Sequence, residues 1–223
     1  MKKSKIDAMV AQVLKRYKTC FRDRDYVLSF VLSFIFFILS AIVSFFAIVY
    51  ATENAGSPVT DFILSNIPVF DVDGLFMYGP IVFGIIIAFY LILNPKKIPF
   101  SLKSIALFLC IRSIAINLTH IGPFPTHIQI NPFGGGFLKT FISGNDLFFS
   151  GHTGLPFLLA LIFWNKKFMR YVCLFVSVFF GAVVLMAHLH YSIDVFAAFF
   201  ITYSVFKIAE ALFKKDYLFS EKK

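Results

Sequence analysis

The sequence predicts an all-α fold: a polytopic membrane protein with six transmembrane helices, an N-terminal interfacial amphipathic helix and both termini cytoplasmic. The 223 residues are 59% apolar and only 15% charged, with a mean hydropathy of +0.82. Soluble chains are about half apolar and a quarter charged. Long uncharged runs and a one-sided distribution of positive residues are the other two observations. Together they exclude an ordinary soluble domain, and the placement of the +9 charge argues against nucleic acid as a partner.

Six apolar runs approach the length of about 20 residues that a transmembrane helix needs. The longest, from Tyr26 to Tyr50, has 25 residues and no charge. Two runs are weaker, because the third contains Lys103 and Arg112 and the fourth contains a polar string around His152. The predicted spans are 26–50, 75–93, 100–120, 147–164, 171–188 and 193–213.

The positive residues predict the orientation of these spans. Of the 21 Lys and Arg residues, 19 fall on one side: eight before the first span, three at 96–103, three at 166–170 and five at 207–223. The positive-inside rule makes this side cytoplasmic. The loop at 51–74, on the other side, contains four acidic residues and no Lys or Arg.

The chain divides into a basic segment at 1–25, a six-helix catalytic domain at 26–213 and a basic tail at 214–223. In the first segment, apolar residues recur at helical spacing, with lysines and Arg16 on other faces. This pattern favours a helix lying on the anionic inner leaflet. The alternative is a basic flank without a fixed helix.

All five histidines fall on or near the non-cytoplasmic face, and one of them begins the string His190-Tyr191-Ser192-Ile193-Asp194. If the helix extends through this string, the i and i+4 positions bring the imidazole and the carboxylate together. A carboxylate bound to one ring nitrogen leaves the other free to attack, as in a catalytic triad. The pair alone is weak evidence, but an aspartate entering a membrane helix needs a partner.

A second polar string runs from Gly144 to Thr153 and includes Asp146, Ser150, Gly151 and His152. Small residues beside a histidine let backbone N–H groups approach a ligand, and a helix starting there would point its positive end at an anion. Alternatively, Ser150 or Thr153 merely caps the fourth span.

Arg112 lies too deep in its span to be a flanking charge. A buried arginine in a membrane should face the helix bundle and meet a carboxylate or a phosphate. The two readings are a phosphate ligand and a structural pair with Asp146.

Three strings resemble the sphingomyelin synthase branch of the lipid phosphatase and phosphotransferase superfamily. They are Arg112–Pro125 (RSIAINLTHIGPFP), Gly144–Thr153 (GNDLFFSGHT) and Ala187–Val195 (AHLHYSIDV). In that family the last two look like Cys-Gly-Asp-x-x-x-Ser-Gly-His-Thr and Ala-His-x-His-Tyr-Thr-x-Asp-Val. The resemblance covers roughly residues 95–213.

The resemblance implies a catalytic triad of His152, His190 and Asp194 and a double displacement without a metal or cofactor. It implies a phospholipid donor and a ceramide-like acceptor within the lipid bilayer, with Arg112 binding phosphate. The other candidate substrate-binding residues lie in the matching strings: Asp146, Ser150, Gly151, Thr153 and Tyr191. It also implies six spans and an active site on the non-cytoplasmic face, periplasmic, exoplasmic or Golgi lumenal. The sequence leaves a homo-oligomer open.

Departures from related patterns bear on the reaction. Gly144, Asn145 and Ser192 are mild changes, whereas Val184 stands where the broader phosphatase pattern has an arginine. A phosphate monoester needs several cationic donors, so a single Arg112 suits a zwitterionic diester better. This favours transfer of phosphocholine or phosphoethanolamine to ceramide. The alternatives are hydrolysis, as in a lipid phosphatase or phospholipase C, and a non-enzymatic lipid-binding protein.

Overall fold

The computed structural model describes residues 2–128 and 147–221, and every regular element in this part of the chain is a helix, as predicted. The elements are α1 (Lys2–Phe21), α2 (Arg24–Glu53), α3 (Asp73–Leu93), η1 (Pro95–Lys97), α4 (Ile98–Leu118), α6 (Gly151–Ile162), α7 (Lys167–Met186), α8 (Ser192–Leu212) and α9 (Lys214–Glu221).

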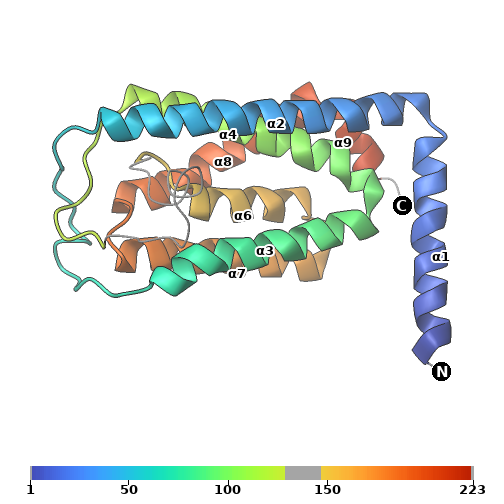
Figure 1. Ribbon diagram of the computed structural model, residues 1–223, viewed down its shortest axis with the longest axis horizontal. Helices are drawn as coiled ribbons and strands as arrows, with labels where there is room; N and C mark the ends of the chain where they lie inside the picture. The colour runs from blue at the N-terminus through green and yellow to red at the C-terminus, as the bar shows by residue number, and fades with distance from the viewer. Residues whose placement is uncertain (1, 129–146, 222–223) are drawn as a thin grey trace.

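The helices from α2 to α8 run along a common axis, and α1 crosses that axis at the end of the bundle that holds both termini (Figure 1). Helix α6 is central and packs against α4, α7 and α8. Its side chains Leu158 and Ala160 are completely buried. Helix α2 packs along α4, while α3 contacts α7 and η1. The core therefore surrounds α6, whose first residues belong to the second polar string of the sequence, Gly144–Thr153.

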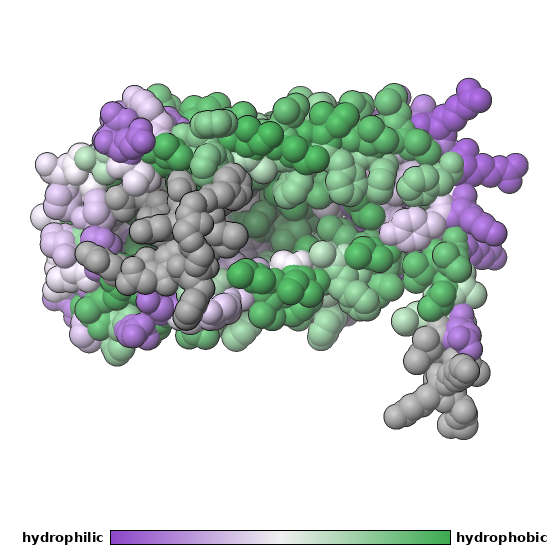
Figure 2. All heavy atoms as spheres, in the orientation of Figure 1, coloured by the Kyte–Doolittle hydropathy of each residue, from purple (hydrophilic) through white to green (hydrophobic). Residues whose placement is uncertain are grey.

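Five helices in the described residues are long and apolar enough to cross a membrane: α2, α3, α4 with η1, α7 and α8. In Figure 2 a hydrophobic surface occupies the middle of the molecule, and strongly hydrophilic residues project from the end with the termini. These features indicate a multi-pass integral membrane protein.

The fourth predicted span differs from the structure. The apolar run at 147–164 forms a helix of 12 residues, α6. At about 1.5 Å per residue this helix is near 18 Å long, less than the roughly 30 Å hydrocarbon core. The helix covers only part of the run because it begins after its N-cap, Ser150. Phe148 and Phe149 before the cap have φ angles of 123° and 27°, which are outside the helical range.

The predicted basic tail is also a helix, α9, which packs back on the bundle. Lys103 Nζ lies 2.7 Å from Asp216 Oδ2, and Lys97 Nζ lies 2.9 Å from Glu221 Oε1. Both lysines are buried. These ion pairs satisfy two positive charges at the terminal end of the bundle, and Lys103 is one of the charges that made the third span look weak.

At the opposite end, two connecting segments are joined by their backbones. Gly56 N–H donates to the carbonyl of His120 at 2.9 Å, and Gly122 N–H donates to the carbonyl of Ser57 at 3.1 Å. A Cβ on Gly122 would lie 2.1 Å from the Gly56 carbonyl oxygen, so the close approach requires glycine. This joined pair of segments supports the start of α8.

Candidate active site

Helix α6 begins inside the Ser-Gly-His-Thr string. The Ser150 side chain accepts a hydrogen bond from Thr153 N–H at 3.4 Å, and the Ser150 carbonyl accepts one from Gly154 N–H at 2.9 Å. Ser150 is therefore the N-cap of α6, and the sequence-based alternative of a capping role is confirmed for this residue. Its side chain and that of Thr153 are fully buried.

His152 lies in the first turn of α6, between aromatic rings from two other helices. Its ring centroid is 4.4 Å from that of Phe76 on α3 and 6.3 Å from that of Phe180 on α7. Helices α3 and α7 meet closely here, because a Cβ on Gly79 would lie 2.6 Å from the Phe180 ring. The aromatic rings restrict where the imidazole can turn.

His190 and Asp194 form a buried pair. His190 Nδ1 lies 3.2 Å from Asp194 Oδ2, and the side chains are 3% and 0% exposed. The sequence reasoning required a helix through both residues, but α8 starts at Ser192. The pair forms because Asp194 reaches back from the first turn and also accepts the Tyr191 N–H at 3.0 Å. With Nδ1 held, Nε2 is the ring nitrogen available for attack.

The two motifs meet through the main chain. Ser150 N–H donates a hydrogen bond to the carbonyl of Asp194 at 3.0 Å. A Cβ on Gly181 of α7 would lie 3.1 Å from Val195 Cγ1 and 3.3 Å from Thr153 Oγ1. The starts of α6 and α8 are thus brought together against α7.

Arg112 on α4 is 5% exposed and lies beside the same loop. Its Nε donates to the carbonyl of Phe149 at 3.2 Å, and a Cβ on Gly151 would lie 3.2 Å from this nitrogen. The side chain therefore reaches the N-terminus of α6, where backbone N–H groups and a guanidinium together favour an anion. Its predicted partner Asp146 lies outside the described residues, as do Gly144 and Asn145.

Tyr191 is 1% exposed and joins the supporting segments to α8. Its hydroxyl donates to the Gly122 carbonyl at 2.8 Å and accepts from Val59 N–H at 3.2 Å. Burial raises the pKa of the Tyr191 phenol, which keeps it protonated as a donor. Its predicted contact with substrate stays a prediction, and this hydroxyl already has a structural use.

Asp61 is a residue that the sequence reasoning missed. In the sequence it is one of four acidic residues in the loop at 51–74, which contains no Lys or Arg, and its partner Ser192 is far along the chain. In the structure it is 8% exposed and accepts hydrogen bonds from Ser192 N–H at 2.7 Å and Ser192 Oγ at 2.5 Å. No local sequence signal marks this contact, because the two residues are 131 positions apart.

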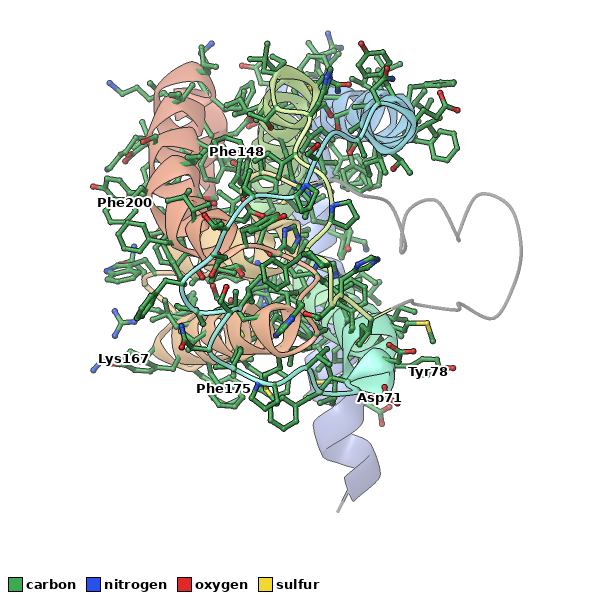
Figure 3. The ribbon with its side chains drawn as sticks, turned by 90° about the vertical axis from the view of Figure 1, so that its left-hand side faces the viewer. Asp71, Tyr78, Phe148, Lys167, Phe175 and Phe200 are labelled. Carbon is green, nitrogen blue, oxygen red and sulfur yellow. The ribbon has the colours of Figure 1, made fainter. Side chains whose placement is uncertain are left out.

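The site contains a buried histidine–carboxylate pair, a second histidine and a buried guanidinium. Figure 3 looks onto this end of the bundle, where α6 lies between α4, α7 and α8 and where Phe148 lies on the side of α4 and α8. Within the described residues, no group of three or more His, Cys, Asp or Glu side chains is placed to hold a metal ion. The arrangement suits nucleophilic and general acid–base chemistry on an anionic ester.

Comparison with known proteins supports an enzyme class. The family model described as PAP2 superfamily C-terminal matches residues 143–211, less than half of the chain. The matched part contains the His152 and His190 motifs but not Arg112. It supports membership of the lipid phosphate phosphatase/PAP2 superfamily, whose members act on phosphate esters. No curated protein and no solved structure matches the chain significantly.

Proposed function

We propose that the protein is a membrane lipid phosphotransferase. It moves a phosphocholine or phosphoethanolamine head group from a glycerophospholipid to ceramide and releases diacylglycerol. The observation behind this proposal is the buried His190–Asp194 pair, 3.2 Å apart, joined by backbone to the loop that holds His152. The resemblance of both motifs to the sphingomyelin synthase family supplies the substrate classes.

In the first half-reaction, Nε2 of His190 attacks the phosphorus atom of the donor. The bond between phosphorus and the diacylglycerol oxygen breaks, and His152 gives its proton to the departing alkoxide. Asp194 keeps Nδ1 protonated and stabilises the positive charge on the phosphorylated ring. Arg112 offsets the charge of the non-bridging oxygens.

In the second half-reaction, His152 accepts the proton of the primary hydroxyl of ceramide. The resulting oxygen nucleophile attacks phosphorus, and the bond between phosphorus and His190 Nε2 breaks. The products are the phospho-head-group ceramide and a free His190. His152 ends protonated, ready for the next donor, so the protons balance over the cycle.

The charge around the site supports a diester substrate. Val184, which stands where the broader phosphatase pattern has an arginine, is completely buried and packs in a cluster with Phe76 and Val183. A phosphate monoester is close to a dianion at neutral pH and needs more positive charge than one guanidinium. A phosphodiester with a cationic head group carries one negative charge and needs less positive charge from the protein.

The proposal also places the active site on one side of the membrane. The site lies at the end of the bundle opposite both termini (Figure 1), and strongly hydrophilic residues project from the terminal end (Figure 2). The segments predicted to be cytoplasmic contain 19 of the 21 Lys and Arg residues. By the positive-inside rule, the site would face the periplasm, the cell exterior or the Golgi lumen. Donor and acceptor would then come from that leaflet.

The test is head-group transfer by the purified protein in vesicles. Phosphatidylcholine or phosphatidylethanolamine with a labelled head group is supplied with ceramide, and labelled sphingolipid and diacylglycerol are measured. The wild type should form both products with at least one donor, and the absence of both with either donor would refute the proposal. His190→Ala should abolish turnover. His120→Ala is the matched control, because this exposed histidine contacts Tyr50 outside the three-residue triad.

The same assay separates transfer from hydrolysis. Without ceramide, a transferase should accumulate a phosphorylated His190 that is detected by mass spectrometry, with little release of free head group. Free phosphocholine or phosphoethanolamine formed at the full rate without ceramide would instead support a phospholipase C-like activity with water as acceptor.

A further inference from the structure

Asp61 forms a link between the segment after α2 and the first residue of α8. We infer that Asp61 is a positioning residue that holds His190 and Asp194 in their reactive geometry, an inference that rests on the proposed function. Asp61 does not touch the reacting atoms in this assignment. It acts through Ser192, which lies two residues from each member of the pair.

The carboxylate of Asp61 has four hydrogen-bond donors. Oδ2 accepts from Ser192 N–H at 2.7 Å, and Oδ1 accepts from Ser192 Oγ at 2.5 Å. Oδ1 also accepts from the backbone N–H groups of Ile63 at 2.9 Å and Leu64 at 3.0 Å. Burial raises the pKa of Asp61, but these hydrogen bonds outweigh it and lower the pKa overall, so the group is ionised at neutral pH.

Two carboxylates hold successive backbone N–H groups at the start of α8. Asp194 Oδ2 accepts the Tyr191 N–H at 3.0 Å, and Asp61 Oδ2 accepts the next one, from Ser192. The first N–H groups of a helix have no partner within the helix. One of these two carboxylates comes from α8 itself and the other from outside it, so the segment after His190 is held from two directions.

The support behind Asp61 is itself fixed. Leu64 is 2% exposed and clusters with Leu147 and Tyr191. The Tyr191 hydroxyl binds Val59 N–H on the same segment. The residues on both sides of Asp61 are thus held by packing or by hydrogen bonds. The Asp61 carboxylate therefore has a fixed position from which it binds Ser192.

The kinetic consequence should appear in kcat. A displacement of about 1 Å of a catalytic group can cost about 10²-fold in rate. Asp61→Ala should therefore lower kcat by about 10–100-fold, with a much smaller change in KM for the donor, because Arg112 is untouched. Ser192→Ala should lower kcat less, and Ser192→Thr, which keeps the hydroxyl, should recover part of that loss.

Asp71→Asn is the matched control for Asp61. Asp71 lies in the same connecting segment and accepts the Asp73 N–H at 3.2 Å. Its side chain lies at the outer edge of the site end, beside α3 (Figure 3). This variant removes a carboxylate from the same segment without removing a bond to α8, and it should keep wild-type kcat.

Hydrogen exchange measured by mass spectrometry gives a readout that does not depend on turnover. In Asp61→Ala, exchange of the peptide spanning 188–195 should accelerate, while peptides from the centre of α7 should keep wild-type protection. Unchanged exchange at 188–195, or accelerated exchange with kcat within twofold of wild type, would overturn the inference. If the wild type transfers no head group from either donor, the proposed function fails, whereas unaltered exchange in the variant is what refutes the link through Ser192.

Discussion

The main-chain N–H of Ser150 donates a 3.0 Å hydrogen bond to the carbonyl oxygen of Asp194. This bond joins the cap of α6 to the first turn of α8, two places that are 44 residues apart in the sequence. Because both partners are backbone atoms, this link between the two motifs does not depend on a flexible side chain.

Asp194→Asn should remove the orientation of His190 while preserving shape. The amide of asparagine can accept the Tyr191 N–H or bind the imidazole, but it supplies no negative charge to stabilise a cationic ring. In a comparable histidine–carboxylate pair such a change lowers kcat by about 10⁴-fold. We expect a loss of at least about 10³-fold in head-group transfer. A variant that keeps more than a tenth of wild-type kcat would contradict the role given to Asp194.

Gly151→Ala should disturb Arg112. The added Cβ would lie 3.2 Å from Nε and 3.4 Å from Cζ of this buried guanidinium, so the side chain must shift by a few tenths of an ångström. We expect kcat/KM for the donor to fall by about tenfold, equivalent to about 1.4 kcal/mol. Gly84→Ala on α3 is the control, because nothing lies within 4 Å of its added Cβ. Equal kinetics for both alanine variants would argue against Arg112 as a phosphate ligand.

Acid should destabilise the protein through His188. This residue is 3% exposed, and its Nδ1 lies 2.6 Å from Thr126 Oγ1. Burial lowers the pKa of His188 from its ordinary value near 6.5, against the opposing charge of Asp61. As the pH falls below about 6.5, the unfolded chain therefore binds a proton that the folded chain does not, and stability decreases until the lowered folded pKa is reached.

The measurement is the melting temperature in detergent between pH 7.5 and 5.5. In His188→Asn the decrease should be smaller than in the wild type. Asparagine is the suitable replacement, because position 188 has a φ of 55°, which asparagine tolerates better than most residues. An identical decrease in both proteins would show that His188 is not the group responsible.

Removing only one partner of the ion pair between Lys103 and Asp216 should strongly lower the free energy of unfolding. The two side chains are 9% and 15% exposed, and Ser29 Oγ also binds Asp216 at 2.5 Å. Asp216→Ala leaves a buried, unpaired ammonium and should lower the free energy of unfolding by about 3–5 kcal/mol. The double variant Lys103→Met with Asp216→Leu should recover most of this loss. Denaturant titration in micelles measures both. The control is Glu210→Ala, which removes the pair with the exposed Lys207 and should change the free energy of unfolding little.

Helix α1 should lie in the membrane interface with its apolar face toward the lipid. The helix is fixed to the end of α3, since Arg16 donates to the Leu93 carbonyl at 2.8 Å. Val10 and Lys15 lie on different faces of the helix, about 140° apart, and both are exposed in the structure. Spin labels at these positions, in a variant without native cysteines, should differ in anionic vesicles: Val10→Cys accessible to oxygen, Lys15→Cys to a water-soluble relaxant. Equal accessibility to the aqueous relaxant would place α1 away from the bilayer.

The elements that could be predicted from sequence are those whose signal is local. Apolar runs located five long helices within a few residues of their ends. The spacing of the His190 string predicted its pair with Asp194, whereas the catalytic roles of the histidines stay a prediction. The predicted fourth span began at residue 147, whereas α6 begins at Gly151, because Ser150 is its N-cap, as the alternative interpretation of that string expected. The docking of α9 and the contact of Asp61 with Ser192 could not be predicted, because they depend on pairs of charged or polar groups separated by more than 100 residues.

The double use of the Asp194 carboxylate has a consequence for how this protein can change over generations. In many enzymes, replacing a catalytic residue makes the fold more robust, so that loss of activity is accompanied by a gain in stability. Here Oδ2 binds both His190, the proposed nucleophile, and the backbone N–H of Tyr191. Losing the chemistry would also weaken the start of α8. A substitution of Asp194 should therefore not produce an inactive variant that is more stable than the present protein.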